Sequence, residues 1–83
     1  MTKEPRDPRT DPRAGDCLRR KYHRRYDGQP YWLERTITTV SQSWPFVSFN
    51  ETSDGENFGG DYCDWSSWQS WARDAEIVRR RET

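Results

Sequence analysis

Apolar and polar residues alternate along much of this chain, at the two-residue period of strands half buried against a core. The first such stretch covers residues 17–25, where Leu18 and Tyr22 share a face but arginines occupy both faces. The second covers residues 31–40, which are rich in the β-branched and aromatic residues that favour strands. Between them, residues 27–30 (DGQP) predict a hairpin turn, because Asp-Gly accommodates positive φ. We expect the far end of the first strand to stand in solvent, since neither of its faces is cleanly apolar.

Two further strands are predicted in the middle of the chain. Residues 44–49 form the third, and Pro45 favours a strand start or an edge position because it cannot donate to a ladder. Residues 50–60 (NETSDGENFGG) predict a loop, because Gly and Asp-Gly punctuate the whole stretch. Residues 61–65 then predict a short fourth strand.

A short amphipathic helix is predicted next. Ser66 and Gln69 have the spacing of a capping box, in which each side chain binds a free N–H of the first turn. Four apolar residues follow at the i, i+3, i+4 and i+7 positions of one helix face, namely Trp68, Trp71, Ala72 and Ala75. Residues 75–79 predict a closing strand.

The order of these elements predicts a mainly β fold. No connection is long enough for a parallel crossover, so the strands should be antiparallel. About five short antiparallel strands with one short helix before the last describe a small SH3-like barrel. Its core would be aromatic, because the chain has five Trp, four Tyr and three Phe, each able to bury a large area.

The first 13 residues have a different composition from the rest. They contain three prolines and no aliphatic residue after Met1, so they offer little apolar surface to offset the entropy of ordering them. We therefore expect residues 1–13 to be a disordered tail and residues 14–83 to be the barrel domain.

Several features bear on the compartment. The chain has no apolar run of about 18 residues and no apolar segment in its charged N-terminus, so we expect neither a membrane span nor a secretory signal. A cytoplasmic location is then the default. Two cysteines, Cys17 and Cys63, form no dense disulfide framework. We expect buried thiols on neighbouring strands, with a disulfide as the alternative.

The residue types needed for catalysis are sparse. The single histidine, His23, lies within an arginine run, and the carboxylates of Asp61 and Asp64 belong to a solvated acidic stretch rather than to a desolvated cleft. Cys17, His23, Cys63 and Asp64 lack the close ligand pair typical of structural zinc. We therefore expect no enzyme, no cofactor and no metal site.

Charge is divided along the chain although its net value is zero. Residues 1–25 carry nine Lys and Arg against four Asp and Glu, whereas residues 26–83 carry five against ten, and residues 51–72 within them carry five acids and no base. The basic run of residues 19–25 interleaves arginines with tyrosine, a pattern typical of phosphate contact and base stacking. Either half of the chain would suit a charged partner, and equally the two halves would neutralise each other across the fold.

Two segments resemble known proteins. Residues 11–18 (DPRAGDCL) resemble the opening Pro, Gly and Asp segment of SH3-like and KOW-type barrels. Residues 63–78 (CDWSSWQSWARDAEIV) are similar to a pattern in small uncharacterised proteins of temperate phages and prophages. The resemblance implies an SH3-like fold and a phage-type accessory protein, and it carries over no catalytic residue.

These observations lead to two hypotheses of binding function. The first is docking on a host protein through surface aromatics, in its concrete form the inhibition of a host defence complex in the manner of anti-CRISPR proteins. Four aromatics exceed the needs of one small core, namely Trp32, Trp44, Phe46 and Phe58. The alternative is nucleic-acid binding by the basic strand; we expect no membrane partner, and the oligomeric state stays open. The candidate binding residues of the two hypotheses are Arg19, Arg20, Lys21, Tyr22, Arg24, Arg25 and Trp44.

Overall fold

One antiparallel sheet and one helix make up the described chain. The computed structural model describes residues 6–41, 43 and 45–80. Its elements are β1 (Cys17–His23), β2 (Pro30–Val40), β3 (Phe46–Ser53), β4 (Glu56–Asp64), α1 (Trp65–Ala72) and β5 (Glu76–Arg79). The mainly β class, the antiparallel pairing and the short helix before the last strand are confirmed.

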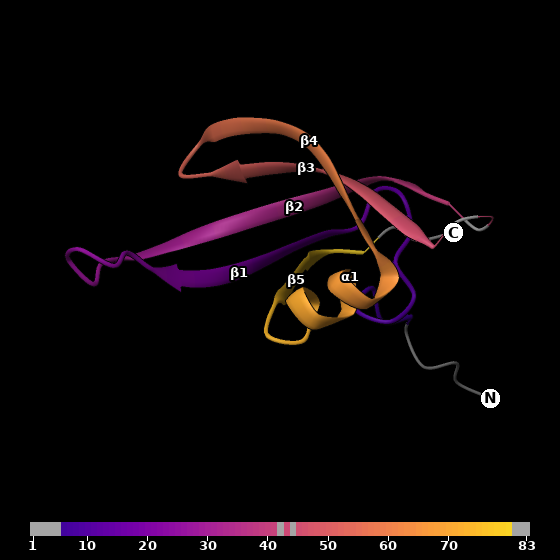
Figure 1. Cartoon of the computed structure of the whole chain (residues 1–83), viewed down its shortest axis with the longest axis horizontal. Helices are drawn as coiled ribbons and strands as arrows, with labels where there is room; N and C mark the ends of the chain where they lie inside the picture. Colours follow the sequence, from indigo (N-terminus) through magenta and orange to yellow (C-terminus); the bar gives the residue numbers. More distant parts are fainter. Residues whose placement is uncertain (1–5, 42, 44, 81–83) are drawn as a thin grey trace.

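The sheet is open. Its strand order is β4-β3-β2-β1-β5, so β4 and β5 form its two edges and do not pair with each other in the described chain. Figure 1 shows α1 beside the edge strand β5 at one half of the sheet, while the β1–β2 hairpin extends well beyond them. The solvated end predicted for the first strand is confirmed, because residues 23–30 are all exposed.

The predicted loop at residues 50–60 is wrong. β3 continues to Ser53, β4 begins at Glu56, and Asp54 and Gly55 form a two-residue turn with φ of 51° and 82°. Positive φ at both central residues is the geometry of a type I′ hairpin turn, which Asp-Gly favours. The polar composition of this stretch reflects exposure of the hairpin, not a lack of strand structure.

The helix packs its apolar face onto the sheet, as predicted. Trp68, Ala72 and Leu18 share one core and are fully buried. The remaining members of this core are Ile37, Val47, Phe49, Trp71 and Ala75. The i, i+3, i+4 and i+7 spacing therefore identified the buried face correctly.

The cap of the helix differs from the prediction. Helix α1 begins at Trp65, and the Oδ1 atom of Asp64 accepts a hydrogen bond of 2.7 Å from the Ser67 N–H. Ser66 therefore lies inside the helix rather than at its cap. Asp64, the last residue of β4, is thus the cap, and it binds the Ser67 N–H rather than the Gln69 N–H that a Ser66 cap would bind.

The Asp64 cap makes stability depend on pH. The hydrogen bonds from the backbone and side chain of Ser67 lower the pKa of Asp64. Because its pKa is lower in the folded state than in the unfolded state, its contribution is present above the unfolded pKa and is lost as pH falls through the folded pKa. We expect Asp64→Ala to lower Tm at pH 7, and Asp64→Asn to preserve it because Asn is an equally good cap.

Thermal melts followed by circular dichroism between neutral pH and about pH 3, which lies below the ordinary Asp range, would test this. The Asn variant should lose less Tm on acidification than the wild type. An Asp64→Ala variant that melts like the wild type at pH 7 would contradict the role of the cap.

Residues 6–13 form a segment, here called the N-terminal strap, that packs against the helix. Pro8 and Pro12 are buried, and the Trp68 Nε1–H donates a 3.0 Å hydrogen bond to the Pro8 carbonyl. The Arg9 guanidinium donates to the Ala75 carbonyl just beyond the helix, with its shorter contact 2.7 Å. The expectation of a disordered tail differs from the structure at these residues, while residues 1–5 lie outside the described chain. The strap has no aliphatic side chain to pack on the domain. Buried proline rings and hydrogen bonds from arginine hold it in place instead.

A buried ion pair anchors the strap. The Asp16 side chain is fully buried and accepts two hydrogen bonds from the Arg6 guanidinium, of 2.5 and 2.8 Å. It also accepts the backbone N–H of Arg13 at 2.8 Å. The hydrogen bond to Asp16 raises the pKa of Arg6 above its ordinary value. The start of the strap is therefore tied to the residue that precedes β1.

The two cysteines lie far apart in the sheet. Cys17 is buried on β1 and Cys63 is half-buried on β4, and both are free thiols. The prediction of neighbouring strands is wrong, because β2 and β3 lie between them. Burial raises the pKa of both thiols, which lowers the reactive thiolate fraction at neutral pH.

Candidate binding groove

The helix covers only part of one sheet face. The register pairs Tyr22 with Tyr31 and Leu18 with Arg35, so alternation places Tyr22, Tyr31 and Leu33 on the same face as the core residue Leu18. The Trp71 Nε1–H donates a 2.8 Å hydrogen bond to the Tyr22 hydroxyl, where the helix meets the hairpin. Beyond this contact the same face continues along the β1–β2 hairpin with no helix over it (Figure 1).

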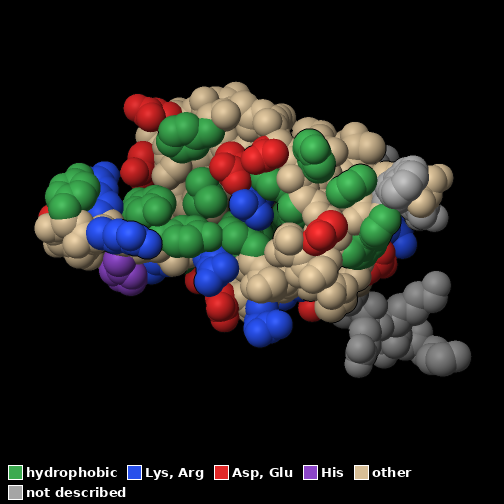
Figure 2. Space-filling model, viewed as in Figure 1, with side chains coloured by type: hydrophobic (Ala, Val, Ile, Leu, Met, Phe, Trp, Pro, Cys, Tyr) green, Lys and Arg blue, Asp and Glu red, His purple; other side chains and the backbone are tan. Residues whose placement is uncertain are grey.

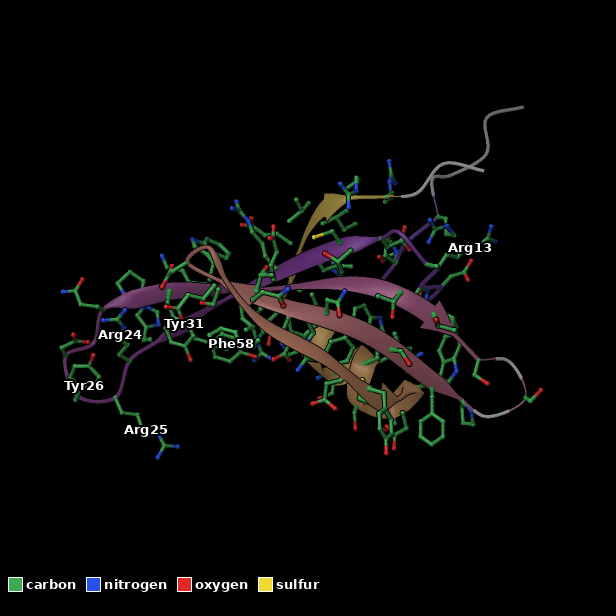
Figure 3. All side chains as sticks on the ribbon, turned by 90° about the horizontal axis from the view of Figure 1, so that it is seen from above. Arg13, Arg24, Arg25, Tyr26, Tyr31 and Phe58 are labelled. Atoms are coloured by element: carbon green, nitrogen blue, oxygen red, sulfur yellow. The ribbon has the colours of Figure 1, made fainter. Side chains whose placement is uncertain are left out.

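The uncovered part of the face forms a groove of about 870 Å³ between the β1–β2 hairpin and the β3–β4 turn. We call it the aromatic groove, and it is lined by Tyr22, His23, Arg24, Arg25, Tyr26, Tyr31, Leu33, Ser53, Asp54, Glu56 and Phe58. The rings of Tyr22 and Tyr31 stack at 5.5 Å between centroids. Phe58 is 60% exposed and Tyr26 is 82% exposed. Figure 3 shows Phe58 beside Tyr31, with Arg24, Arg25 and Tyr26 farther out at the tip of the hairpin.

The rim of the groove carries charges of both signs. His23, Arg24 and Arg25 lie on the hairpin side, and Asp54 and Glu56 lie at the β3–β4 turn. Figure 2 shows hydrophobic side chains along this face with basic groups on one side and acidic groups on the other. Arg24 lies 3.9 Å from Asp27. Within the part of the chain that the structure describes, Arg25, Asp54 and Glu56 make no ion pair.

The structure divides the predicted basic strand between two faces. Arg19 and Lys21 lie over the Trp32 ring on the face opposite the helix, 4.3 and 5.9 Å from its centroid. Arg20 and Tyr22 lie on the helix side, and Arg24 and Arg25 stand at the hairpin tip. The predicted residues 19–25 therefore do not form one surface.

Acids from the C-terminal part pair with two arginines of this basic run. Arg19 forms a 3.0 Å ion pair with Glu76, and Arg20 lies 3.5 Å from Asp74. Exposed pairs of this kind add little stability but reduce the local field that a polyanion would meet. The possibility that the two charged halves cancel across the fold is confirmed at these two arginines.

The predicted surface aromatics differ in their exposure and in their position on the sheet. Phe46 is 38% exposed and packs edge-on against Tyr62, whereas Phe58 lines the groove. Trp32 is half-buried under the two basic side chains. Trp44, the tryptophan chosen as a binding candidate, lies outside the described residues. Of these predicted aromatics, Phe58 is therefore the described one that lines the groove.

Sequence reasoning missed Arg35, which joins the covered and uncovered parts of the face. Its guanidinium lies 4.3 Å from the Phe49 ring centroid and 4.4 Å from that of Trp71, and it forms a 2.9 Å ion pair with Glu51. The half-buried guanidinium is therefore stabilised both by stacking on aromatic rings and by an ion pair. The available signal was an arginine on the apolar face of the second strand.

The predicted absence of catalytic and metal chemistry stays a prediction. His23 lies exposed at the end of β1, and Asp64 caps α1. In the ranges the structure covers, no three His, Cys, Asp or Glu side chains gather closely enough to hold a metal ion. No described helix is both long enough and apolar enough to cross a bilayer.

Comparison with protein-family models, with curated proteins and with solved structures finds no match to this chain. The resemblance to small phage proteins and to SH3-like barrels therefore stays a prediction.

Proposed function

We propose that this chain is a small binding protein that docks on a partner protein through the aromatic groove. The observation that carries the proposal is that the apolar sheet face continues past the end of α1 and ends at exposed Phe58 and Tyr26. Exposed aromatics at the edge of a preformed groove are typical anchors of protein interfaces. The stacked Tyr22 and Tyr31 rings give the groove a preorganised floor.

The charges around the groove favour a protein over a nucleic acid. Asp54 and Glu56 line the same groove as Arg24 and Arg25, so a phosphate backbone would meet acids beside its basic contacts. Arg19 and Arg20 are already paired with Glu76 and Asp74. A protein segment carrying both kinds of charge suits this rim better than a uniform polyanion.

The kind of partner is proposed from the sequence resemblance. Small phage accessory proteins act inside the host cell, and a groove on a chain of 83 residues suits docking on a host protein. Inhibition of a host defence complex, in the manner of anti-CRISPR proteins, is the concrete form of this proposal. An SH3-like origin for the bent five-stranded sheet belongs to the same proposal and rests on residues 11–18.

The groove proposal predicts a specific loss of binding when Phe58 is changed. We expect Phe58→Ser to reduce partner recovery from nuclease-treated host lysate by about tenfold or more, because aromatic anchors dominate interface energies. Phe46→Ser is the matched control, since Phe46 is also exposed but lies outside the groove. Affinity capture with quantitative mass spectrometry would measure both variants. Equal recovery by wild type and Phe58→Ser would contradict the groove as the docking site.

A titration separates this proposal from the nucleic-acid alternative. We expect single- and double-stranded DNA and RNA of mixed sequence to show no binding at low salt up to about 100 μM protein, where non-specific binders normally register. Binding that weakens steeply with salt, and that is lost when Arg20, Arg24 and Arg25 become Ser, would replace protein docking with nucleic-acid binding.

A further inference from the structure

We infer that, before a partner binds, the aromatic groove holds the hairpin tip of a second copy of this chain, so that the free protein is a symmetric dimer. The inference rests on the proposed function, because it takes the groove to be a docking site. It adds an occupant for the groove and a means of regulating access to it.

The hairpin tip offers an aromatic ring and a charge that complement those on the β3–β4 side of the groove. Arg25, Tyr26 and Asp27 are consecutive and exposed, and Tyr26 presents 82% of its surface to solvent. The β3–β4 side of the groove offers the exposed Phe58 ring and the carboxylate of Glu56. Tyr26 of one copy therefore suits Phe58 of the other, because paired aromatics gain beyond their buried area.

Unpaired charges lie at complementary positions. Arg25 makes no ion pair with any residue that the structure describes, and the same holds for Asp54 and Glu56. The other arginines of the basic run mostly have acidic neighbours, as Arg19 has in Glu76 and Arg24 has in Asp27. In the dimer, Arg25 of one copy would lie beside Asp54 and Glu56 of the other. The guanidinium and the carboxylates would then gain ion-pair partners.

Two-fold symmetry allows both contacts to form at once. In such an interface a contact between residues i and j occurs twice, so each copy needs both the tip and the groove on one face. Here the tip residues Arg24, Arg25 and Tyr26 line the same groove as Glu56 and Phe58. The net charge of zero means that two copies carry no overall repulsion to overcome.

Self-association would regulate the groove by competition. A partner protein must displace the second copy, so its apparent affinity falls as the concentration of this chain rises. The dimer would also cover the exposed rings of Phe58 and Tyr26.

Charge reversal at one contact tests the dimer without disturbing the core. The two variants are Arg25→Glu and Glu56→Lys, and Arg73→Glu is the control because Arg73 is exposed on the helix cap, away from the groove. In sedimentation-velocity dilution series reaching about 1 mM, the range of weak interfaces, wild type and control should pass reversibly from monomer to dimer. Each groove variant alone should raise the dimer Kd by about tenfold or more, because like charges then face each other twice.

Mixing the two groove variants gives the decisive result. Each contact in the mixed dimer joins Glu to Lys or Arg to Glu, so the mixture should dimerise more tightly than either variant alone. A monomeric wild type, or groove variants that dimerise like the control, would overturn the inference. So would a mixture that stays monomeric. None of these results touches the proposed function, which fails separately if Phe58→Ser retains partner capture from lysate; circular dichroism melts confirm that each variant is folded.

Discussion

Replacing Trp68 with alanine should remove cooperative folding, at a cost of about 3–5 kcal/mol in the free energy of unfolding. The Trp68 side chain is fully buried and its ring lies 5.5 Å from the Trp71 centroid and 6.1 Å from that of Phe49. Its indole N–H also binds the Pro8 carbonyl. The loss approaches the total stability expected of a domain this small. Thermal and urea melts followed by circular dichroism would measure it.

Two further variants separate the contributions of Trp68. Trp68→Phe keeps an aromatic ring in the core but leaves the Pro8 carbonyl without its donor, so it should cost less than alanine. Trp65→Ala is the control, because Trp65 is only half-buried on the first turn of α1. A Trp68→Ala variant that melts with wild-type cooperativity would show that the helix does not close the core.

Replacing Arg6 with alanine should destabilise the protein by about 3–5 kcal/mol, although Arg6 lies in the segment with the least apolar sequence. The reason is that the fully buried Asp16 carboxylate would lose both of its guanidinium hydrogen bonds. A buried charge without its partner is costly, whereas removing both charges costs less. Urea unfolding monitored by tryptophan fluorescence would measure the change.

A double-mutant cycle tests the origin of that loss. Arg6→Ala combined with Asp16→Asn should be more stable than Arg6→Ala alone, because the uncharged amide leaves no buried charge unpaired. Arg73→Ala, at an exposed position on the helix cap, serves as the matched arginine control. If Arg6→Ala unfolds at the wild-type urea concentration, the strap does not pack on the domain in solution. Its residues would then belong to the disordered tail that the sequence predicts.

The strands and the helix face were predictable because their signals are local. Alternation located β1 and β2, and the spacing of Trp68, Trp71 and Ala72 identified the buried side of α1. The prediction of a loop at residues 50–60 was wrong because Asp-Gly is typical both of loops and of tight hairpin turns. Local sequence also gave no sign that β4 and β5 stay unpaired, since closure depends on how far the whole sheet bends.

The strap and the groove could not be predicted, because both depend on contacts between distant parts of the chain. Pro8 is ordered by Trp68, and Arg9 by the Ala75 carbonyl, neither of which lies near it in sequence. The basic run looked like one surface until alternation and pairing divided it between two faces. The groove exists because an eight-residue helix is shorter than the sheet face it covers, and that comparison requires the three-dimensional arrangement.

The N-terminal strap also determines when the domain can complete its folding during synthesis. Pro8 and Trp68 are 60 residues apart, and Arg9 and Ala75 are 66 apart. The ribosome therefore releases the strap well before the surface on which it docks. Contacts of such long range slow folding, because a large loop must close before they form. The strap must wait in the nascent chain until the helix and the segment after it have emerged, so the domain reaches its final form only after Ala75 has left the ribosome.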